Sequence, residues 1–133
     1  MHRALLLASV TCLFAASFRP ADVAIVGDIE YGQTSDPVDC SDTPRYRALV
    51  FNGNSGDRVE VTVKGRDRKA FVAFADGTLR ELASGTTHLG FTLPNAGPDA
   101  EAYYIVFRDN EDKPAQFTVE LKKVKKELVA EAQ

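Results

Sequence analysis

Arg58-Val59-Glu60-Val61-Thr62-Val63-Lys64 is the stretch of sequence that decides the fold class. Its three valines alternate with charged and polar residues, and successive side chains of a β-strand point to opposite faces of a sheet. This strand is therefore predicted to bury one face and to expose the other to water, as strands of antiparallel sheets do. The same alternation recurs at 116–122 and 87–93, where the side chains predicted to face inward are Phe117, Val119, Leu121, Leu89, Phe91 and Leu93.

Three further segments, 48–51, 70–74 and 103–107, are apolar at almost every position, as expected for strands in the middle of a sandwich. Clusters of Gly, Asn, Asp and Pro separate the segments and supply turns. Short strands near 25–31 and 79–82 bring the total to about eight, with no helix between them. The sequence therefore predicts an all-β fold, a two-sheet antiparallel sandwich of the jelly-roll or immunoglobulin-like kind.

The amino end has the pattern of a secretory signal peptide, a basic start at 1–3 followed by an apolar run at 4–16. Small residues at its end predict cleavage after Ser17, with a cut nearer Ala24 as the alternative. The apolar run is shorter than the roughly 20 residues that cross a bilayer. We therefore expect a secreted or periplasmic protein with no membrane span once the signal is removed.

The predicted organisation is a signal peptide at 1–17, a leader segment at 18–28, a sandwich domain at 29–122 and a charged tail at 123–133. Bacterial lipoproteins attach lipid to a cysteine that ends the apolar run of the signal. Ser9-Val10-Thr11 before Cys12 is a poor match to the residues that precede such a cysteine, so lipid attachment is disfavoured. The lysines at the start of the tail are expected to be solvated.

The size and composition of the chain exclude several function classes. Its 133 residues leave room for one domain, and a net charge of −3 gives no electrostatic reason to expect nucleic acid.

Signal removal leaves one cysteine, Cys40, and one histidine, His88. Cys40 is expected to be buried as a small apolar side chain, with an intermolecular bridge as the alternative. His88 alternates with inward residues and should face outward, with no motif for a zinc site or a catalytic triad.

Two groups of residues are candidate binding sites. Asp36, Asp39 and Asp42 place three carboxylates in one loop, and Ca²⁺ takes such oxygen ligands, although Asp is also an ordinary turn former. The other group is aromatic and cationic. The phase of the predicted strands points Tyr46, Tyr104 and Arg108 outward, where they would offer a ligand rigid stacking area and a charge.

The order of motifs resembles a known family. It runs from Ile29-Glu30-Tyr31-Gly32, through Leu49-x-Phe51-x-Gly53 and Ser55-Gly56-Asp57-Arg58-Val59, to Asp76-Gly77-Thr78-Leu79, Tyr103-Tyr104-Ile105-Val106-Phe107 and Phe117-Thr118-Val119. These motifs are similar to those of the bacterial pre-peptidase C-terminal (PPC) domain, a jelly-roll-like β-sandwich of exported proteins. The chain departs from the family at Arg68-Lys69-Ala70, where the family has an Asp, and at Glu101-Ala102-Tyr103.

The resemblance implies attachment to a substrate such as collagen or polysaccharide, or assistance in secretion. It also implies calcium bound by some members through acids near the start of the domain, the region of Asp36, Asp39 and Asp42. Together with the residues, it predicts an exported, non-catalytic module that binds an extracellular or envelope polymer or protein. The alternatives are a small hydrolase that uses a carboxylate pair and a structural envelope protein stabilised by calcium.

Overall fold

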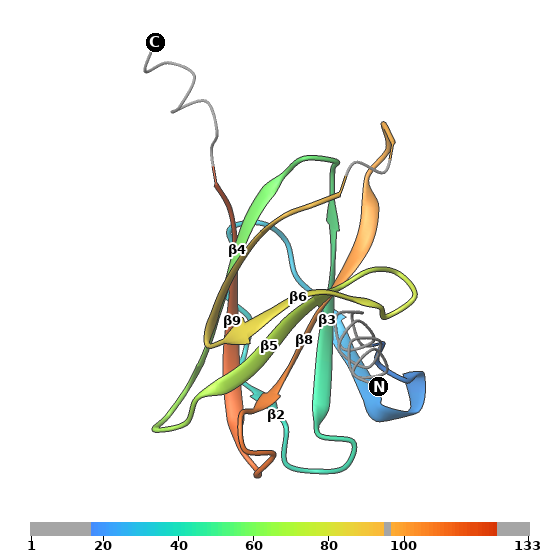
Figure 1. Cartoon of the computed structure of the whole chain (residues 1–133). Coiled ribbons are helices and arrows are strands. Elements are labelled where there is room, and N and C mark those ends of the chain that lie inside the picture. Colours follow the sequence, from blue (N-terminus) through green and yellow to red (C-terminus); the bar gives the residue numbers. More distant parts are fainter. Residues whose placement is uncertain (1–16, 95–96, 125–133) are drawn as a thin grey trace, which may run out of the picture.

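Nine strands form two stacked sheets in the computed structural model, which describes residues 17–94 and 97–124 (Figure 1). In chain order the elements are a 3₁₀ turn η1 (Pro20–Asp22), β1 (Val23–Asp28), β2 (Val38–Asp39), β3 (Tyr46–Gly53), β4 (Arg58–Gly65), β5 (Ala70–Ala75), β6 (Glu81–Thr86), β7 (His88–Thr92), β8 (Glu101–Asp109) and β9 (Gln116–Val124). One sheet has the order β1-β3-β8-β5-β6 and the other has the order β2-β9-β4-β7. The predicted two-sheet sandwich is confirmed.

The core fills the space between the two sheets. The three valines of β4 are fully buried, and Val119 and Leu121 of β9 are buried beside them, as their alternation predicts. The five-stranded sheet contributes its own inward residues to the same cluster, and these include several large buried side chains: Phe51, Phe74, Ile105 and Phe107. Burial of apolar surface in this core makes the largest favourable contribution to the folding free energy of the two packed sheets.

The strand β1 lies in the segment predicted to be a leader. It pairs with β3, and this pair is parallel, whereas the other strand pairs are antiparallel. Ahead of it, the backbone N–H of Phe18 donates a hydrogen bond of 2.9 Å to the carbonyl of Leu79. Residues 18–28 are therefore part of the sandwich. The sequence predicts a short strand near 25–31, but it does not reveal the pairing with β3, because a parallel partner can lie anywhere along the chain and leaves no hairpin turn between the strands.

The two long sides of the sandwich differ. On one side, Thr87 carries the chain from β6 in one sheet to β7 in the other: its N–H donates to Ala70, and its carbonyl accepts from Val63. Thr87 has a φ of +66°, in the left-handed region that β-branched residues seldom adopt. On the opposite side the edges are β1 and the two-residue β2, and the chain between them is a loop.

Two buried carboxylates hold turns at opposite ends of the sandwich. Asp57, just before β4, accepts hydrogen bonds from the Tyr31 hydroxyl (2.8 Å) and the Asn54 N–H (2.9 Å). Asp109, the last residue of β8, receives two hydrogen bonds of 2.7 Å from Arg68 in the β4–β5 loop. Figure 1 places the β3–β4 turn at the top of the sandwich and the β8–β9 turn at the bottom.

Two sequence predictions lie mostly outside the described residues. The signal peptide covers 1–17, of which only Ser17 is described, and the tail prediction covers 123–133, of which Lys123 and Val124 belong to β9. Within 17–94 and 97–124, no helix is long and apolar enough to span a membrane.

Candidate functional site

The outer face of the five-stranded sheet carries a cluster of aromatic side chains. We call Phe18, Tyr46, Phe71, Tyr104 and Arg108 the aromatic face; all five side chains are partly exposed. Three of them, Tyr46, Tyr104 and Arg108, are the residues predicted from strand phase to point outward, and the structure places them on the same sheet face.

Strand register brings these residues together. Tyr103, Ile105 and Phe107 of β8 are buried in the core, so the alternate residues Tyr104 and Arg108 face away from it. Arg108 lies opposite Phe71 of β5, and Tyr104 lies opposite Val50 of β3. A cluster of small buried side chains lies beneath these residues, and Phe18, Tyr46 and Tyr104 pack against it. The cluster consists of Val23, Ala48, Ala75 and Val106.

Arg108 is held between a ring and a carboxylate. Its guanidinium carbon lies 4.6 Å from the centroid of the Tyr46 ring, within range of a cation–π interaction. Its Nη1 atom lies 2.9 Å from a carboxylate oxygen of Asp112. Its Nε atom is buried and finds no hydrogen-bond partner in the described part of the chain. This arrangement fixes the cationic group at the surface of the sheet.

The rings around Tyr46 also fix one another. Phe18 and Tyr46 meet edge to face with 5.3 Å between ring centroids, and Tyr46 and Phe71 do so at 5.9 Å. Phe18 and Phe71 lie 6.5 Å apart. Edge-to-face pairs at these distances are favourable beyond the area they bury. The three rings therefore form a preorganised cluster built from the amino-terminal segment, β3 and β5.

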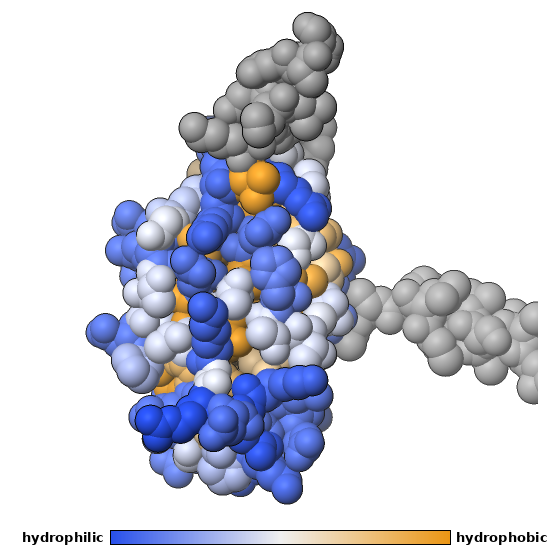
Figure 2. Space-filling model, turned by 90° about the vertical axis from the view of Figure 1, so that its left-hand side faces the viewer, coloured by the Kyte–Doolittle hydropathy of each residue, from blue (hydrophilic) through white to orange (hydrophobic). Residues whose placement is uncertain are grey.

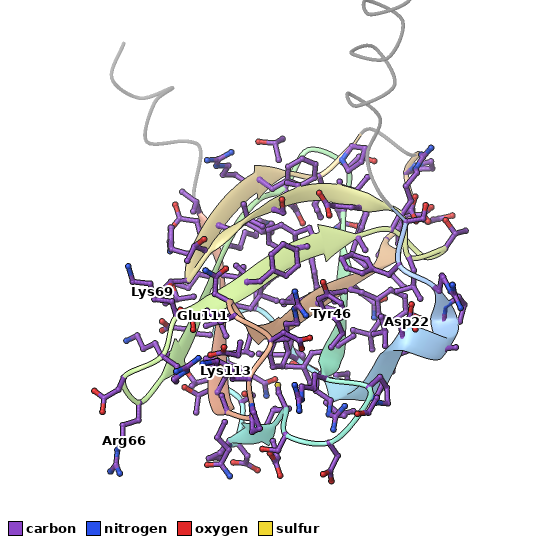
Figure 3. All side chains as sticks on the ribbon, turned by 60° about the horizontal axis from the view of Figure 1, so that its bottom comes forward. Asp22, Tyr46, Arg66, Lys69, Glu111 and Lys113 are labelled. Atoms are coloured by element: carbon purple, nitrogen blue, oxygen red, sulfur yellow. The ribbon has the colours of Figure 1, made fainter. Side chains whose placement is uncertain are left out.

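A cleft of about 310 Å³ opens beside Tyr46. Its lining residues are Asp22, Thr43, Pro44, Arg45, Tyr46, Arg108 and Asp112. Two arginines converge there on one carboxylate, since Arg45 Nη1 lies 3.7 Å from the Asp112 oxygen that also binds Arg108. In Figure 3, Tyr46 and Asp22 lie on one side of this end of the sandwich, and Lys69, Glu111 and Lys113 lie on the other. Such a cleft can bind a planar or acidic group by stacking and by arginine hydrogen bonds.

The outer face of the four-stranded sheet is different in character. Residues of β4 and β9 that alternate with the core are charged or polar: Arg58, Glu60, Thr62, Lys64, Thr118, Glu120 and Lys122. Figure 2 shows this side as largely hydrophilic, with hydrophilic residues gathered at its lower end, where the β4–β5 and β8–β9 turns lie. An ordinary solvated sheet face looks like this, so the aromatic face is the more unusual surface.

The predicted calcium ligands do not converge on one point. Within 17–94 and 97–124, no three acidic, His or Cys side chains are grouped closely enough to hold a metal ion, and this includes Asp36, Asp39 and Asp42. Asp39 instead accepts a hydrogen bond from the Ser41 N–H at 3.0 Å, and its pKa is lowered by hydrogen bonds from Ser41. The structure thus gives Asp39 the role of a turn former, and calcium binding stays a prediction.

Groups that perform nucleophilic or acid–base chemistry are placed elsewhere. Cys40 is fully buried, as expected of a small apolar side chain, and burial raises the pKa of its thiol to about 11. His88 faces outward as predicted, with its Nδ1 atom 3.0 Å from the Thr62 hydroxyl. Wherever a carboxylate pKa is shifted among the described residues it is lowered, as at Asp57 and Asp109. A general acid for glycoside hydrolysis needs the opposite shift.

Among the residues of the site that were not identified from the sequence, four make its ring and ion-pair contacts. Phe71 had a usable signal, because it alternates with the inward residues Ala70, Val72 and Phe74. Phe18 lies in the segment predicted to be a leader, and no pattern in the sequence marked it as a site residue. Arg45 and Asp112 are 67 residues apart, and the cleft that they line depends on the pairing of β3 with β8. Only the tertiary structure brings them together.

No family model and no curated protein matches this chain. Among solved structures, the fold is similar to the pre-peptidase C-terminal domain of collagenase from Bacillus anthracis, with a TM-score of 0.55 and 14% identity over 79% of this chain and 99% of that one. It is also similar to PliG of Aeromonas hydrophila, a periplasmic inhibitor of g-type lysozyme, with a TM-score of 0.54 and 12% identity over 77% of this chain and 99% of the inhibitor. At such identities the likeness concerns the fold, and it confirms a PPC-like β-sandwich.

Proposed function

We propose that this protein is an exported, non-catalytic β-sandwich that binds a partner protein through its aromatic face. The observation that carries the proposal is the convergence of Tyr46, Tyr104 and Arg108 with Phe18 and Phe71 on one outer sheet face. Each is partly exposed and held by its neighbours. The binding energy of protein interfaces is concentrated in residues of these types.

The composition of this surface favours a protein over a polysaccharide as the partner. Tyrosine, phenylalanine and arginine are enriched at the centres of protein interfaces, and preordered rings lose little entropy when a partner binds. The chain has no tryptophan, the side chain with the largest area for stacking on a sugar ring. Arg108 is partly exposed, and its guanidinium carries five N–H donors, so it can also bind an acidic side chain of the partner.

Export is supported by two independent observations. The amino-terminal sequence has the pattern of a signal peptide. Two solved structures of similar fold are a domain of a collagenase and a periplasmic inhibitor. A non-catalytic role fits the lowered carboxylate pKa values and the buried thiol.

The test measures retention of residues 18–133 on three immobilised probes: a g-type lysozyme, collagen and peptidoglycan. We expect retention on a protein probe. In the double variant Tyr104→Ala, Arg108→Ala the affinity should fall about tenfold or more, because it removes two interface anchors. The matched control, Thr62→Ala with Lys64→Ala, changes the opposite outer face and should bind like the unmodified chain.

The outcomes separate the possibilities. Thermal unfolding of each variant is measured first, so that loss of binding is not confused with loss of the fold. Retention on peptidoglycan alone would contradict a protein partner. Equal retention of both double variants would place the contact away from the aromatic face, and no retention on any probe would contradict the proposal for these three partner classes.

A further inference from the structure

The four edge strands of the described sheets differ in how well they are protected against pairing with another chain. In the four-stranded sheet one edge, β2, has only two residues. The edges β6 and β7 adjoin at the side that Thr87 closes, and each contains a glycine. The remaining edge, β1, has six residues, and its span Val23–Gly27 contains neither a charge nor a proline. Short strands, charges and prolines protect sheet edges, so β1 is the least protected of the four.

The strand β1 also carries the two large apolar side chains that are exposed in 17–94 and 97–124, Ile25 at 53% and Val26 at 47%. Ile25 pairs with Ala48, which belongs to the apolar cluster beneath the aromatic face, so Ile25 lies on that outer face. Val26 lies at a β-bulge, where the register with β3 shifts. In Figure 1 the blue segment that holds η1 and β1 lies beyond β3, at the edge of the sandwich. A strand that pairs with β1 would cover apolar surface that water now contacts.

We propose that β1 pairs antiparallel with β1 of a second copy of this chain, which joins two five-stranded sheets into one continuous sheet. An antiparallel pair of identical strands is related by a twofold axis perpendicular to the sheet, so the same surface serves both copies and the contact closes on itself. With Ala24 on this axis, Val23 of each copy lies opposite Ile25 of the other. Apolar side chains of the two copies then meet on the outer face, as stabilising cross-strand pairs do.

The charges that flank β1 favour a second copy as the occupant of this edge. Arg19, ahead of β1, has a side chain that is 79% exposed, whereas Asp28 at the end of β1 and Glu30 just after it are exposed carboxylates. In an antiparallel pair, the residues ahead of β1 in one copy approach those after β1 in the other. Arg19 therefore approaches two carboxylates of the second copy, and the twofold axis repeats this contact.

These charged groups are available for such a contact. Neither Asp28 nor Glu30 has an ion-pair partner in the described ranges. Arg19 lies 3.6 Å from a carboxylate oxygen of Asp22, but both side chains are mostly exposed, and ion pairs of this kind contribute little. In the register with Ala24 on the axis, Asp22 falls opposite the apolar Val26, so no two carboxylates face each other.

The twofold axis also determines how the two copies present their other surfaces. Because the axis is perpendicular to the sheet, the aromatic faces of both copies lie on the same side of the joined sheet. The dimer thus doubles the surface through which we propose that a partner binds, although the dimer itself does not depend on that proposal. The bulge at Val26 limits the regular strand pair to a short span, and contacts of small area form weak dimers.

Sedimentation velocity of the exported chain over a wide range of concentrations measures the dimer dissociation constant. The edge variant carries Ile25→Lys and Val26→Lys, which place like charges on both sides of the axis at positions that are already exposed. The matched control carries Ser84→Lys and Thr86→Lys, two exposed positions of β6 at the opposite edge of the same sheet. We expect the unmodified chain and the control to dimerise equally, and the edge variant about tenfold more weakly or worse.

An exchange of charges tests the antiparallel orientation. One variant carries Arg19→Glu, and the other carries Asp28→Arg with Glu30→Arg. Each variant alone sets like charges against each other at both contacts, so at low salt its dimer should be about tenfold weaker. An equimolar mixture of the two should dimerise again, because both contacts of the mixed dimer join opposite charges.

The outcomes are decisive once thermal unfolding has shown that each variant keeps the fold. A monomer at every concentration would overturn the proposal, and so would a dimer that the edge variant leaves unchanged. A mixture of the two charge variants with no recovery would contradict the antiparallel orientation. Amide hydrogen exchange gives a further readout: it should slow within 23–27 as the protein concentration rises, and exchange there that is independent of concentration would contradict a strand pair.

Discussion

The two ends of the sandwich are each held by a buried aspartate, but the charge of that aspartate is balanced in different ways. Asp109 forms a two-bond ion pair with Arg68 and accepts the backbone N–H groups of Glu111 and Lys113. Asp57 accepts a tyrosine hydroxyl and one backbone N–H, and the Lys123 ammonium lies 3.5 Å away. A bidentate arginine pair is the stronger of the two arrangements.

The difference matters because only one end carries the candidate site. The β8–β9 turn that Asp109 holds contains Asp112, and Asp112 positions both Arg108 and Arg45 at the cleft. The β3–β4 turn that Asp57 holds contributes no residue to the aromatic face. We infer that the stronger carboxylate anchor supports a surface in which several charged side chains must keep fixed positions.

The largest expected effect follows from removing Asp109. In Asp109→Ala the two hydrogen bonds from the partly exposed Arg68 are lost and two backbone N–H groups lose their acceptor, so we expect the free energy of unfolding to fall by about 3 kcal/mol. Urea denaturation at neutral pH measures it. Asp57→Ala serves as the comparison and should cost less. An equal or larger loss for Asp57→Ala would contradict the ranking of the two ends.

A smaller effect is expected in the dependence of stability on pH. The hydrogen bonds from Arg68 lower the pKa of Asp109 despite its burial, so the unfolded chain takes up a proton at a higher pH than the folded protein does. The stability that Asp109 contributes is therefore present above about pH 5 and is lost as the pH falls toward the lowered folded value. The difference in unfolding free energy between the unmodified chain and Asp109→Asn should shrink steadily below that pH.

Asp57 gives the matching comparison for this pH experiment. Burial raises its pKa, but hydrogen bonds from Asn54 and Tyr31 and the charge of Lys123 outweigh that effect and leave the pKa lowered. In Asp57→Asn the unfolding free energy should fall less steeply at acidic pH than it does in the unmodified chain. This change should be smaller than the one expected for Asp109→Asn. Urea denaturation between acidic and neutral pH measures both variants; a curve that Asp109→Asn leaves parallel to that of the unmodified chain would contradict the assignment.

The smallest effect is expected for Tyr31→Phe. This variant removes one hydrogen bond to Asp57 and leaves the Asn54 N–H in place, so the free energy of unfolding should fall by about 1 kcal/mol. Thermal or urea unfolding is the measurement. Tyr104→Phe is the control, because the Tyr104 hydroxyl has no hydrogen-bond partner among the residues described, and its stability should stay nearly unchanged. Equal losses in the two variants would show that the Tyr31 hydroxyl contributes nothing specific.

Much of the candidate site was predictable from strand phase. The alternation that buries Tyr103, Ile105 and Phe107 also turns Tyr104 and Arg108 outward, and the structure confirms both directions. The ion pair between Arg68 and Asp109 was not predictable, because its partners are 41 residues apart and meet only when β5 pairs with β8. Nothing near either residue in the sequence marks the other as its partner.

The loop of Asp36, Asp39 and Asp42 is the opposite case, because here the sequence predicted a site whose residues the structure does not bring together. Its composition fits a calcium site, but the structure does not bring the three carboxylates together. A composition states which ligands are available, whereas a metal site also requires their oxygens to meet at one point. That condition depends on the path of the loop, which the residue types alone do not fix.

The sequence by itself determined that this chain is a β-sandwich and which face of most strands is buried, because a period of two in hydrophobicity is a local property of each strand. It also contained the pattern of a signal peptide. Only the tertiary structure decided that residues 23–28 form a parallel edge strand, that Arg108 stacks on Tyr46, and that each end closes over a buried aspartate. These features join distant segments, and their energies depend on a register and a burial that exist only after the two sheets have packed.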